Sequence, residues 1–255
     1  MIKYSYNVLV RWVIIPIISI EEKERCVTTK FRAKINSNEH TCCYLVYKLD
    51  FFILVKVGES LKPEKYSVAT STQWFAEEIK IYAQIYEEKK DHKEVRKFLL
   101  ENNVFNNSSQ QSAKDRIGKV ARRAESLGEE GMSLLDQASI DDEKALILMS
   151  YLNSYRLIYE FVFEWLAPRM NEFQPIVYTS ELENFYYHKQ LQHPEELKLT
   201  EGGLKRIQSQ VFNMLTHSGL LVKKDKGIYE LHRLLLSETL SRFFIKSSPY
   251  DSIII

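Results

Sequence analysis

The sequence predicts a mainly α protein, a compact helical bundle with two helix-turn-helix-like elements, a small β-wing near the C-terminus and a β-prone N-terminal extension. Only 8 glycines and 6 prolines occur in 255 residues, which disfavours a turn-rich β-sandwich. From Thr70 onward, apolar residues recur at spacings of three and four, as one face of a helix requires. Two short segments are locally basic although the formal net charge is only +1.

Residues 1–58 differ from the rest of the chain. They are β-prone, as in "CCYLVYKLDFFILVKV", and show no clean amphipathic period. No methionine occurs between Met1 and Met132. We expect an atypical N-terminal extension, which is either a small β-hairpin appendage or an upstream translation from a mis-set start, with the working protein beginning near Val57.

Cysteine usage and hydropathy point to a cytoplasmic protein. The three cysteines include the adjacent pair Cys42 and Cys43, which makes a poor disulfide framework and indicates a reducing compartment. The apolar stretch "VLVRWVIIPIISI" is interrupted by Arg11 and Pro16 and is shorter than the ~20 residues of a membrane span. We therefore expect neither secretion nor membrane insertion.

A first helical domain is predicted over 59–172. Phe75, Ile79, Tyr82 and Tyr86 line one face of its first helix. A short helix in "HKEVRKFLLENN" follows, and then a basic helix over about 112–127. The inward-facing residues of that basic helix are Ala113, Ile117, Val120, Ala121, Ala124 and Leu127. The domain should end with a long helix from about Asp142 to Leu166, limited by Pro168 and apolar nearly all round, which predicts the buried centre of the fold.

A second helical domain is predicted over 173–255. "SELENFYYHKQLQ" forms its first helix, and the stretch after Thr200 forms another that ends at Gly219. The second of these faces inward with Leu204, Ile207, Val211 and Leu215. "LVKKDKGIYEL" then predicts a tight two-stranded wing, because Asp225 to Gly227 is turn chemistry. A last helix runs through Leu234, Leu235, Leu240 and Phe244.

No catalytic apparatus is recognisable in the sequence. It contains no phosphate-binding G-x-x-x-x-G-K-[ST] loop, no G-x-G-x-x-G, no H-E-x-x-H and no G-x-S-x-G. The histidines show no metal-ligand spacing, and the paired acids are typical of helix ends or solvated faces. We expect a non-enzymatic protein without a cofactor, metal or small-molecule substrate.

The first basic helix follows a polar turn, "NNVFNNSS", which is the outline of a helix-turn-helix. Residues 109–126 hold five cations and two acids. A solvated face would account for such a charge run as well as a nucleic-acid contact. The candidate DNA-binding residues are Lys114, Arg116, Lys119, Arg122 and Arg123. On the DNA-contact interpretation, replacing Arg122 and Arg123 by Glu should weaken binding and leave the fold intact.

The second basic segment combines a helix with the predicted wing. Residues 201–227 again hold five cations and two acids. Arg and Lys suit guanine edges and phosphates, whereas Asn and Gln suit adenine edges. The candidate DNA-binding residues are Lys205, Arg206, Ser209, Gln210 and Asn213 on the helix, and Lys223, Lys224 and Lys226 on the wing.

Several blocks of the sequence together resemble the BrxA family of BREX bacteriophage-exclusion systems, also catalogued as a putative inner-membrane protein family. The blocks are "KYSVATST", "FLLENNVF" with "SAKDRIGKVARRAESL", "LILMSYLNSYRLIYEFVFEWL" and "LTEGGLKRIQSQVFNMLTHSGLL". The resemblance covers roughly 65–245. It implies a small helical monomer that binds double-stranded DNA through two helix-turn-helix elements and works with other BREX components, which carry the chemistry.

Both approaches favour a non-catalytic, double-stranded DNA-binding accessory component of a BREX-type defence system. Two alternatives stay open. The helix-turn-helix units could serve only to dock partners, which would make the protein an interaction scaffold without DNA contact. A helical RNA-binding module is the other, although the basic residues lack an aromatic platform for stacking single-stranded bases.

Overall fold

The computed structural model describes residues 62–66, 73–172 and 174–255. The predicted N-terminal extension over 1–58, the three cysteines and the predicted start near Val57 lie outside the described residues.

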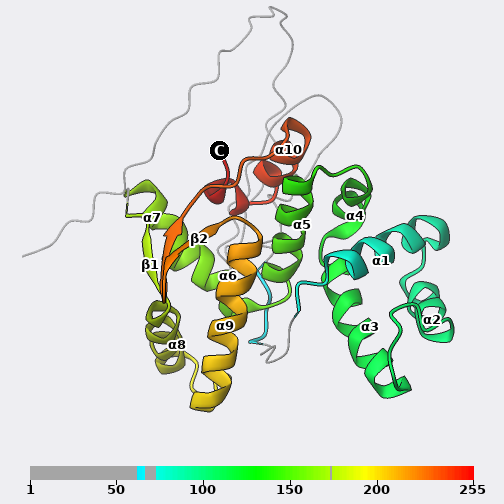
Figure 1. Ribbon diagram of the computed structural model, residues 1–255, viewed down its shortest axis with the longest axis horizontal. Helices are drawn as coiled ribbons and strands as arrows, with labels where there is room; N and C mark the ends of the chain where they lie inside the picture. The colour runs from blue at the N-terminus through cyan, green and yellow to red at the C-terminus, as the bar shows by residue number, and fades with distance from the viewer. Residues whose placement is uncertain (1–61, 67–72, 173) are drawn as a thin grey trace, which may run out of the picture. The chain divides into compact units, whose positions relative to one another are not determined.

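The described chain is mainly α-helical, as predicted (Figure 1). Its α-helices are α1 (Ala76–Lys89), α2 (His92–Glu101), α3 (Gln110–Glu125), α4 (Gly128–Asp136), α5 (Ile140–Leu152), α6 (Arg156–Glu160), α7 (Ala167–Asn171), α8 (Ser180–Gln192), α9 (Glu201–His217) and α10 (Glu238–Lys246). A π-helical turn, η1 (Phe161–Leu166), joins α6 to α7, and a short 3₁₀ turn, η2 (Tyr250–Ile253), follows α10.

A small antiparallel sheet accompanies the C-terminal helices. Its strands β1 (Ile176–Tyr178), β2 (Leu221–Asp225) and β3 (Ile228–Leu231) lie in the order β1-β3-β2. β2 and β3 form the predicted hairpin, whose turn includes Gly227 at a φ of 73°. Glycine adopts this left-handed conformation without the strain that a Cβ would add. In chain order the module reads β1, α8, α9, β2, β3.

The inward faces predicted for α1, α3 and α9 are confirmed, whereas the last helix begins only at Glu238, so Leu234 and Leu235 lie before it and Leu235 is exposed. Every residue predicted to face inward on α1, α3 and α9 is buried, and so are most residues of α5. Nearly all of the apolar side chains among them belong to one hydrophobic cluster, in which Phe161 of η1 packs against both Phe185 of α8 and Phe212 of α9. The predicted division into 59–172 and 173–255 therefore falls within a continuous core, and it stays a prediction.

The prediction of one long helix from Asp142 to Leu166 is wrong, because the helix breaks after Leu152. Tyr155 is extended, with a φ of −135°, and α6 begins at the next residue. The break is stabilised by Asn153, whose amide donates to the carbonyl of Ser126 and accepts from the hydroxyl of Tyr250 at 2.6 Å. These partners come from distant segments, so the sequence of the helix alone did not indicate them.

The predicted end before Pro168 is also wrong. α7 continues to Asn171 with Pro168 in its first turn, where a missing N–H costs no helical hydrogen bond. In the described ranges, no helix has the length and apolar character needed to cross a membrane.

Candidate nucleic-acid interface

The first basic helix, α3, is capped by Ser109, whose hydroxyl accepts from the backbone N–H of Ser112 at 3.2 Å. Its apolar stripe packs against α1, α2 and α4. Of the five predicted contact residues, Lys114 and Arg122 are exposed and Lys119 is half-buried. Only part of the predicted cationic face is therefore accessible to a ligand.

Arg123 requires a correction, because its side chain is 0% exposed. Its guanidinium donates to the carbonyls of Gln73, Trp74 and Ile147 at 2.9–3.0 Å and to the hydroxyl of Ser150 at 3.2 Å. Burial lowers the pKa of Arg123 to about 10, so it stays charged at neutral pH. A side chain held in this way joins the core elements and cannot contact DNA.

Arg116 is also mostly engaged within the protein. Its guanidinium forms an ion pair with Glu78 of α1 and donates to the carbonyl of Phe105 at 3.1 Å. The guanidinium also lies 5.6 Å from the centre of the Phe105 ring. Neutralisation by Glu78 makes Arg116 a poor phosphate ligand, because binding DNA would compete with an existing ion pair.

The second basic helix, α9, presents a continuous polar surface. Its N-cap is Thr200, whose hydroxyl accepts from the backbone N–H of Gly203 at 3.1 Å. The exposed predicted residues on α9 are Lys205, Arg206, Ser209 and Asn213, and Gln210 is half-buried. Lys205 pairs with Glu201 at 2.6 Å, but both side chains are about 70% exposed, so solvent screens the pair.

Two further exposed residues continue this row beyond Asn213. Thr216 and His217 follow three and four positions later, so helical spacing could have identified them. The ring of His217 lies 5.6 Å from that of Trp74, which precedes α1, while the Thr216 hydroxyl donates to the carbonyl of Phe212 at 2.7 Å. His217 therefore lies where α9 meets the segment leading into α1.

The hairpin carries Lys223, Lys224 and Lys226, all exposed as predicted. Lys224 forms an ion pair with Glu230 of β3. Tyr229 of β3 packs on Phe212 of α9, with ring centroids 4.8 Å apart. This contact fixes the hairpin to α9, so the lysines project from a supported structure.

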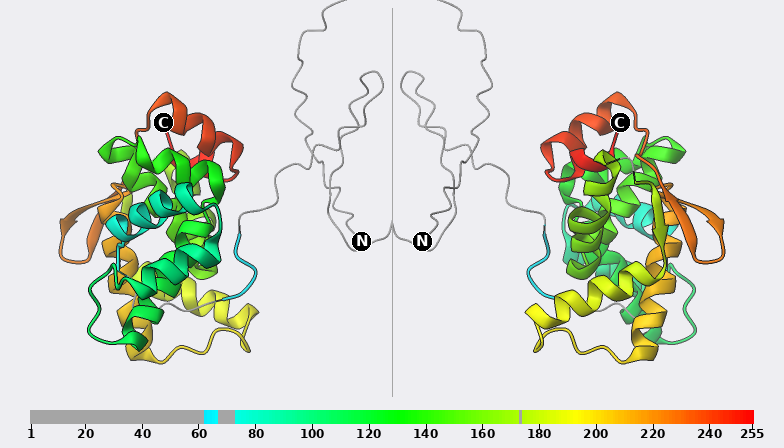
Figure 2. Two further views of the ribbon diagram at one scale, coloured as in Figure 1. Left: turned by 90° about the vertical axis from the view of Figure 1, so that its right-hand side faces the viewer. Right: turned by 90° about the vertical axis from the view of Figure 1, so that its left-hand side faces the viewer.

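Helices α3 and α9 run in similar directions in the molecule. In Figure 1 the N-terminal ends of both point downward, and Figure 2 shows the same arrangement from two other sides. In many helix-turn-helix proteins the N-terminal residues of the recognition helix contact the bases. The corresponding ends of the two basic helices thus point the same way.

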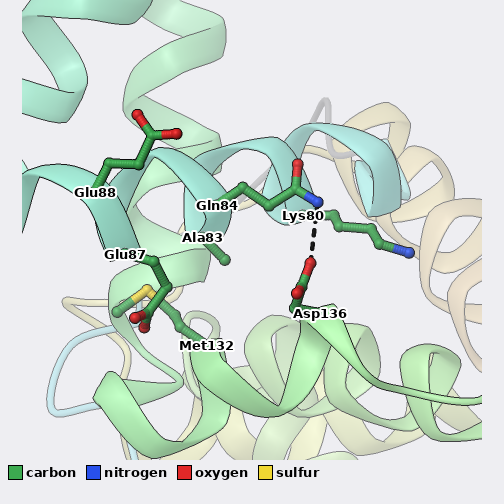
Figure 3. Close-up of a pocket in the computed structure, with 7 residues that line it drawn as sticks. All are labelled: Lys80, Ala83, Gln84, Glu87, Glu88, Met132 and Asp136. Atoms are coloured by element: carbon green, nitrogen blue, oxygen red, sulfur yellow. Dashed lines mark hydrogen bonds between the residues drawn. The ribbon is translucent and has the colours of Figure 1, made fainter.

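A hollow between α1 and α4 is acidic. It has a volume of about 260 Å³, and Figure 3 shows Glu87, Glu88 and Asp136 around it together with Lys80, Gln84, Ala83 and Met132. Gln84 donates to Asp136 at 3.1 Å across it. Three carboxylates against one lysine make this hollow unfavourable for phosphate groups.

These observations define a mainly α-helical protein with a small three-stranded sheet and two locally basic helices, one of them continued by a basic hairpin. The chain belongs to the BrxA family, whose model matches residues 64–248. Family membership points to a component of a BREX phage-defence system. No curated protein matches the chain.

Proposed function

We propose that this protein is a non-catalytic accessory component of its BREX system that binds double-stranded DNA mainly through α9 and the β2–β3 hairpin. In this proposal β1, α8, α9, β2 and β3 form a winged helix-turn-helix. α9 is its recognition helix and the hairpin is its wing. It acts as a monomer in the cytoplasm and docks on other BREX components.

The observation that carries the proposal is the combination of exposed side chains on α9 with the supported lysine hairpin directly after it. Arg206, Ser209 and Asn213 supply the donors and acceptors that suit phosphates and base edges. Lys223 and Lys226 add exposed cations beside the helix. These donors, acceptors and cations suit a recognition helix inserted into a DNA groove with a basic hairpin against the phosphate backbone.

The role proposed for α3 is smaller than its sequence indicated. Lys114 and Arg122 remain as exposed cations on α3, and Lys119 is half-buried. We assign α3 to auxiliary phosphate contacts in a first helix-turn-helix with α2. Such contacts position a protein on the duplex without reading its sequence. The resulting binding is of modest affinity and tolerant of DNA sequence.

A salt titration of binding to duplex DNA, duplex RNA and single strands tests the proposal. Each phosphate contact should contribute about −0.9 to the slope of log K against log salt on duplex DNA. Preference for duplex RNA or single strands would favour the RNA-binding alternative. If no nucleic acid binds at low salt, or if binding does not change with salt, the interaction-scaffold alternative is favoured instead.

A further inference from the structure

Glu160 is a buried carboxylate, 0% exposed, at the end of α6. It accepts a hydrogen bond from the hydroxyl of Tyr66 at 2.7 Å, and Tyr66 lies 94 positions earlier in the chain. The Lys62 ammonium lies 2.8 Å from the same carboxylate, and Arg156 donates to it at 2.9 Å. Residues 62–66, here called the strap, are thereby attached to the core.

Helix α8 also holds this carboxylate, through the oxygen that accepts from Tyr66. The Lys189 ammonium lies 3.2 Å from Glu160 and 2.5 Å from Glu164. The ring of Tyr66 lies under the guanidinium of Arg156 at 4.2 Å and beside the ring of His193 at 5.1 Å. His193 is the C-cap residue of α8. The strap therefore contacts the end of α8 both through Glu160 and directly.

Residues 193–200, the α8–α9 turn, connect this end of α8 to α9. The hydroxyl of Tyr186 accepts from the backbone N–H of Leu199 at 2.9 Å, and Gln190 donates to the carbonyl of Leu197 at 2.8 Å. The turn is thus bound to α8, and α9 begins at Glu201 immediately afterwards. A shift at the C-terminal end of α8 would move the first turn of α9.

The charges explain why the cluster holds its segments together. Burial by itself would raise the pKa of Glu160, but hydrogen bonds from Lys62, Tyr66, Arg156 and Lys189 outweigh it and hold the pKa at about 2. The carboxylate is therefore ionised at neutral pH. Removing one partner would leave the buried Glu160 carboxylate less well compensated, which costs free energy. The cluster therefore holds all four partners together.

We infer that Tyr66 and Lys62 are positioning residues for DNA binding: the strap holds α8 and the α8–α9 turn where α9 can meet the duplex. This inference rests on the proposed function of α9. It assigns a role in binding to a segment that lies far from α9 in the sequence and carries none of the contact residues.

The test compares two Tyr→Phe substitutions in the full chain. Tyr66→Phe removes the hydroxyl bond to Glu160 and keeps the ring on Arg156. The matched control, Tyr86→Phe, removes a similar bond, 2.8 Å long, to Glu129, which joins α1 to α4. Amide hydrogen exchange over 193–203 and duplex affinity at fixed salt are measured for both variants.

Tyr66→Phe should speed exchange over 193–203 and weaken duplex binding by roughly fivefold, the equivalent of one lost hydrogen bond. Tyr86→Phe should change neither. Lys62→Met should act in the same direction as Tyr66→Phe, and it carries the test if that variant fails to fold, because the Lys62 side chain is 33% exposed and its loss leaves three partners.

Wild-type exchange over 193–203 in both strap variants would overturn the inference. An equal loss of affinity in Tyr86→Phe would also overturn it, because the effect would then reflect general destabilisation. If the unaltered protein binds no duplex, the proposed function fails, and the exchange measurement alone still decides whether the strap positions the turn.

Discussion

The two basic helices carry similar charge in the sequence and use it differently in the fold. Both lie in segments with five cations and two acids. On α3, one arginine is buried against backbone carbonyls and another is paired with Glu78. On α9, both cations are exposed and a lysine-bearing hairpin follows. The difference teaches that a basic helix is a basic surface only where the neighbouring elements leave its cations uncovered.

The largest expected effect is a loss of stability on substitution of Arg123, the buried arginine of α3. Arg123→Glu would place a carboxylate against four groups that now accept hydrogen bonds, so we expect a loss of about 3–5 kcal/mol and unfolding. This replaces the sequence-based expectation that the fold tolerates Glu at both Arg122 and Arg123. Circular dichroism melts measure it.

The control for that prediction is Arg122→Glu, one position away and exposed. It should change stability by no more than about 0.5 kcal/mol. A well-folded Arg123→Glu protein with the melting temperature of this control would contradict the assignment of Arg123 to the core.

Acid unfolding should distinguish the buried carboxylate of Glu160 from the buried guanidinium of Arg123. Because the pKa of Glu160 is held at about 2, below that of an unfolded glutamate, its contribution is complete above the unfolded value and is lost as pH falls through about 2. Arg123 stays protonated throughout that range. Urea unfolding from pH 6 to pH 2 should show a steeper acid loss in the unaltered protein than in Glu160→Gln. Equal slopes would be evidence against the ionised Glu160 cluster.

The contributions of α9 and α3 to DNA binding can be compared by removing two exposed cations from each helix. Lys205→Ala with Arg206→Ala on α9 should reduce the magnitude of the salt slope for duplex DNA by up to about 2. Lys114→Ala with Arg122→Ala on α3 should reduce it less, because that helix is proposed to make auxiliary contacts. Gel shifts over a salt series provide the slopes. A larger loss from the α3 pair would reverse the proposed order of the two helices.

The smallest expected effect lies in the hairpin. Lys226→Ala should reduce the magnitude of the slope by about 1 if this lysine contacts a phosphate. Lys224→Ala should reduce it less, because Lys224 is already paired with Glu230. Neither change should lower the melting temperature, since both side chains are exposed. Identical slopes for the two variants would show that the ion pair with Glu230 does not limit Lys224.

Much of the fold follows from local sequence patterns. The spacing of Leu204, Ile207 and Val211 gave the inner face of α9, and the turn residues before Gly227 gave the hairpin. These features could be predicted because helical periodicity and turn chemistry depend on residues that are close in the chain. The same locality explains why Lys205, Arg206, Ser209 and Asn213 were identified as exposed residues of α9, since its apolar stripe defines the opposite face.

By itself, the sequence determined the helical class, the inward stripes, the hairpin and the two basic segments. Only the tertiary structure decided that Arg123 is covered, that the central helix breaks after Leu152, and that Tyr66 reaches Glu160. The physical reason is that periodicity orients a side chain about its own helix axis. Whether that side chain meets solvent, a carbonyl or a distant carboxylate depends on which other segments pack there.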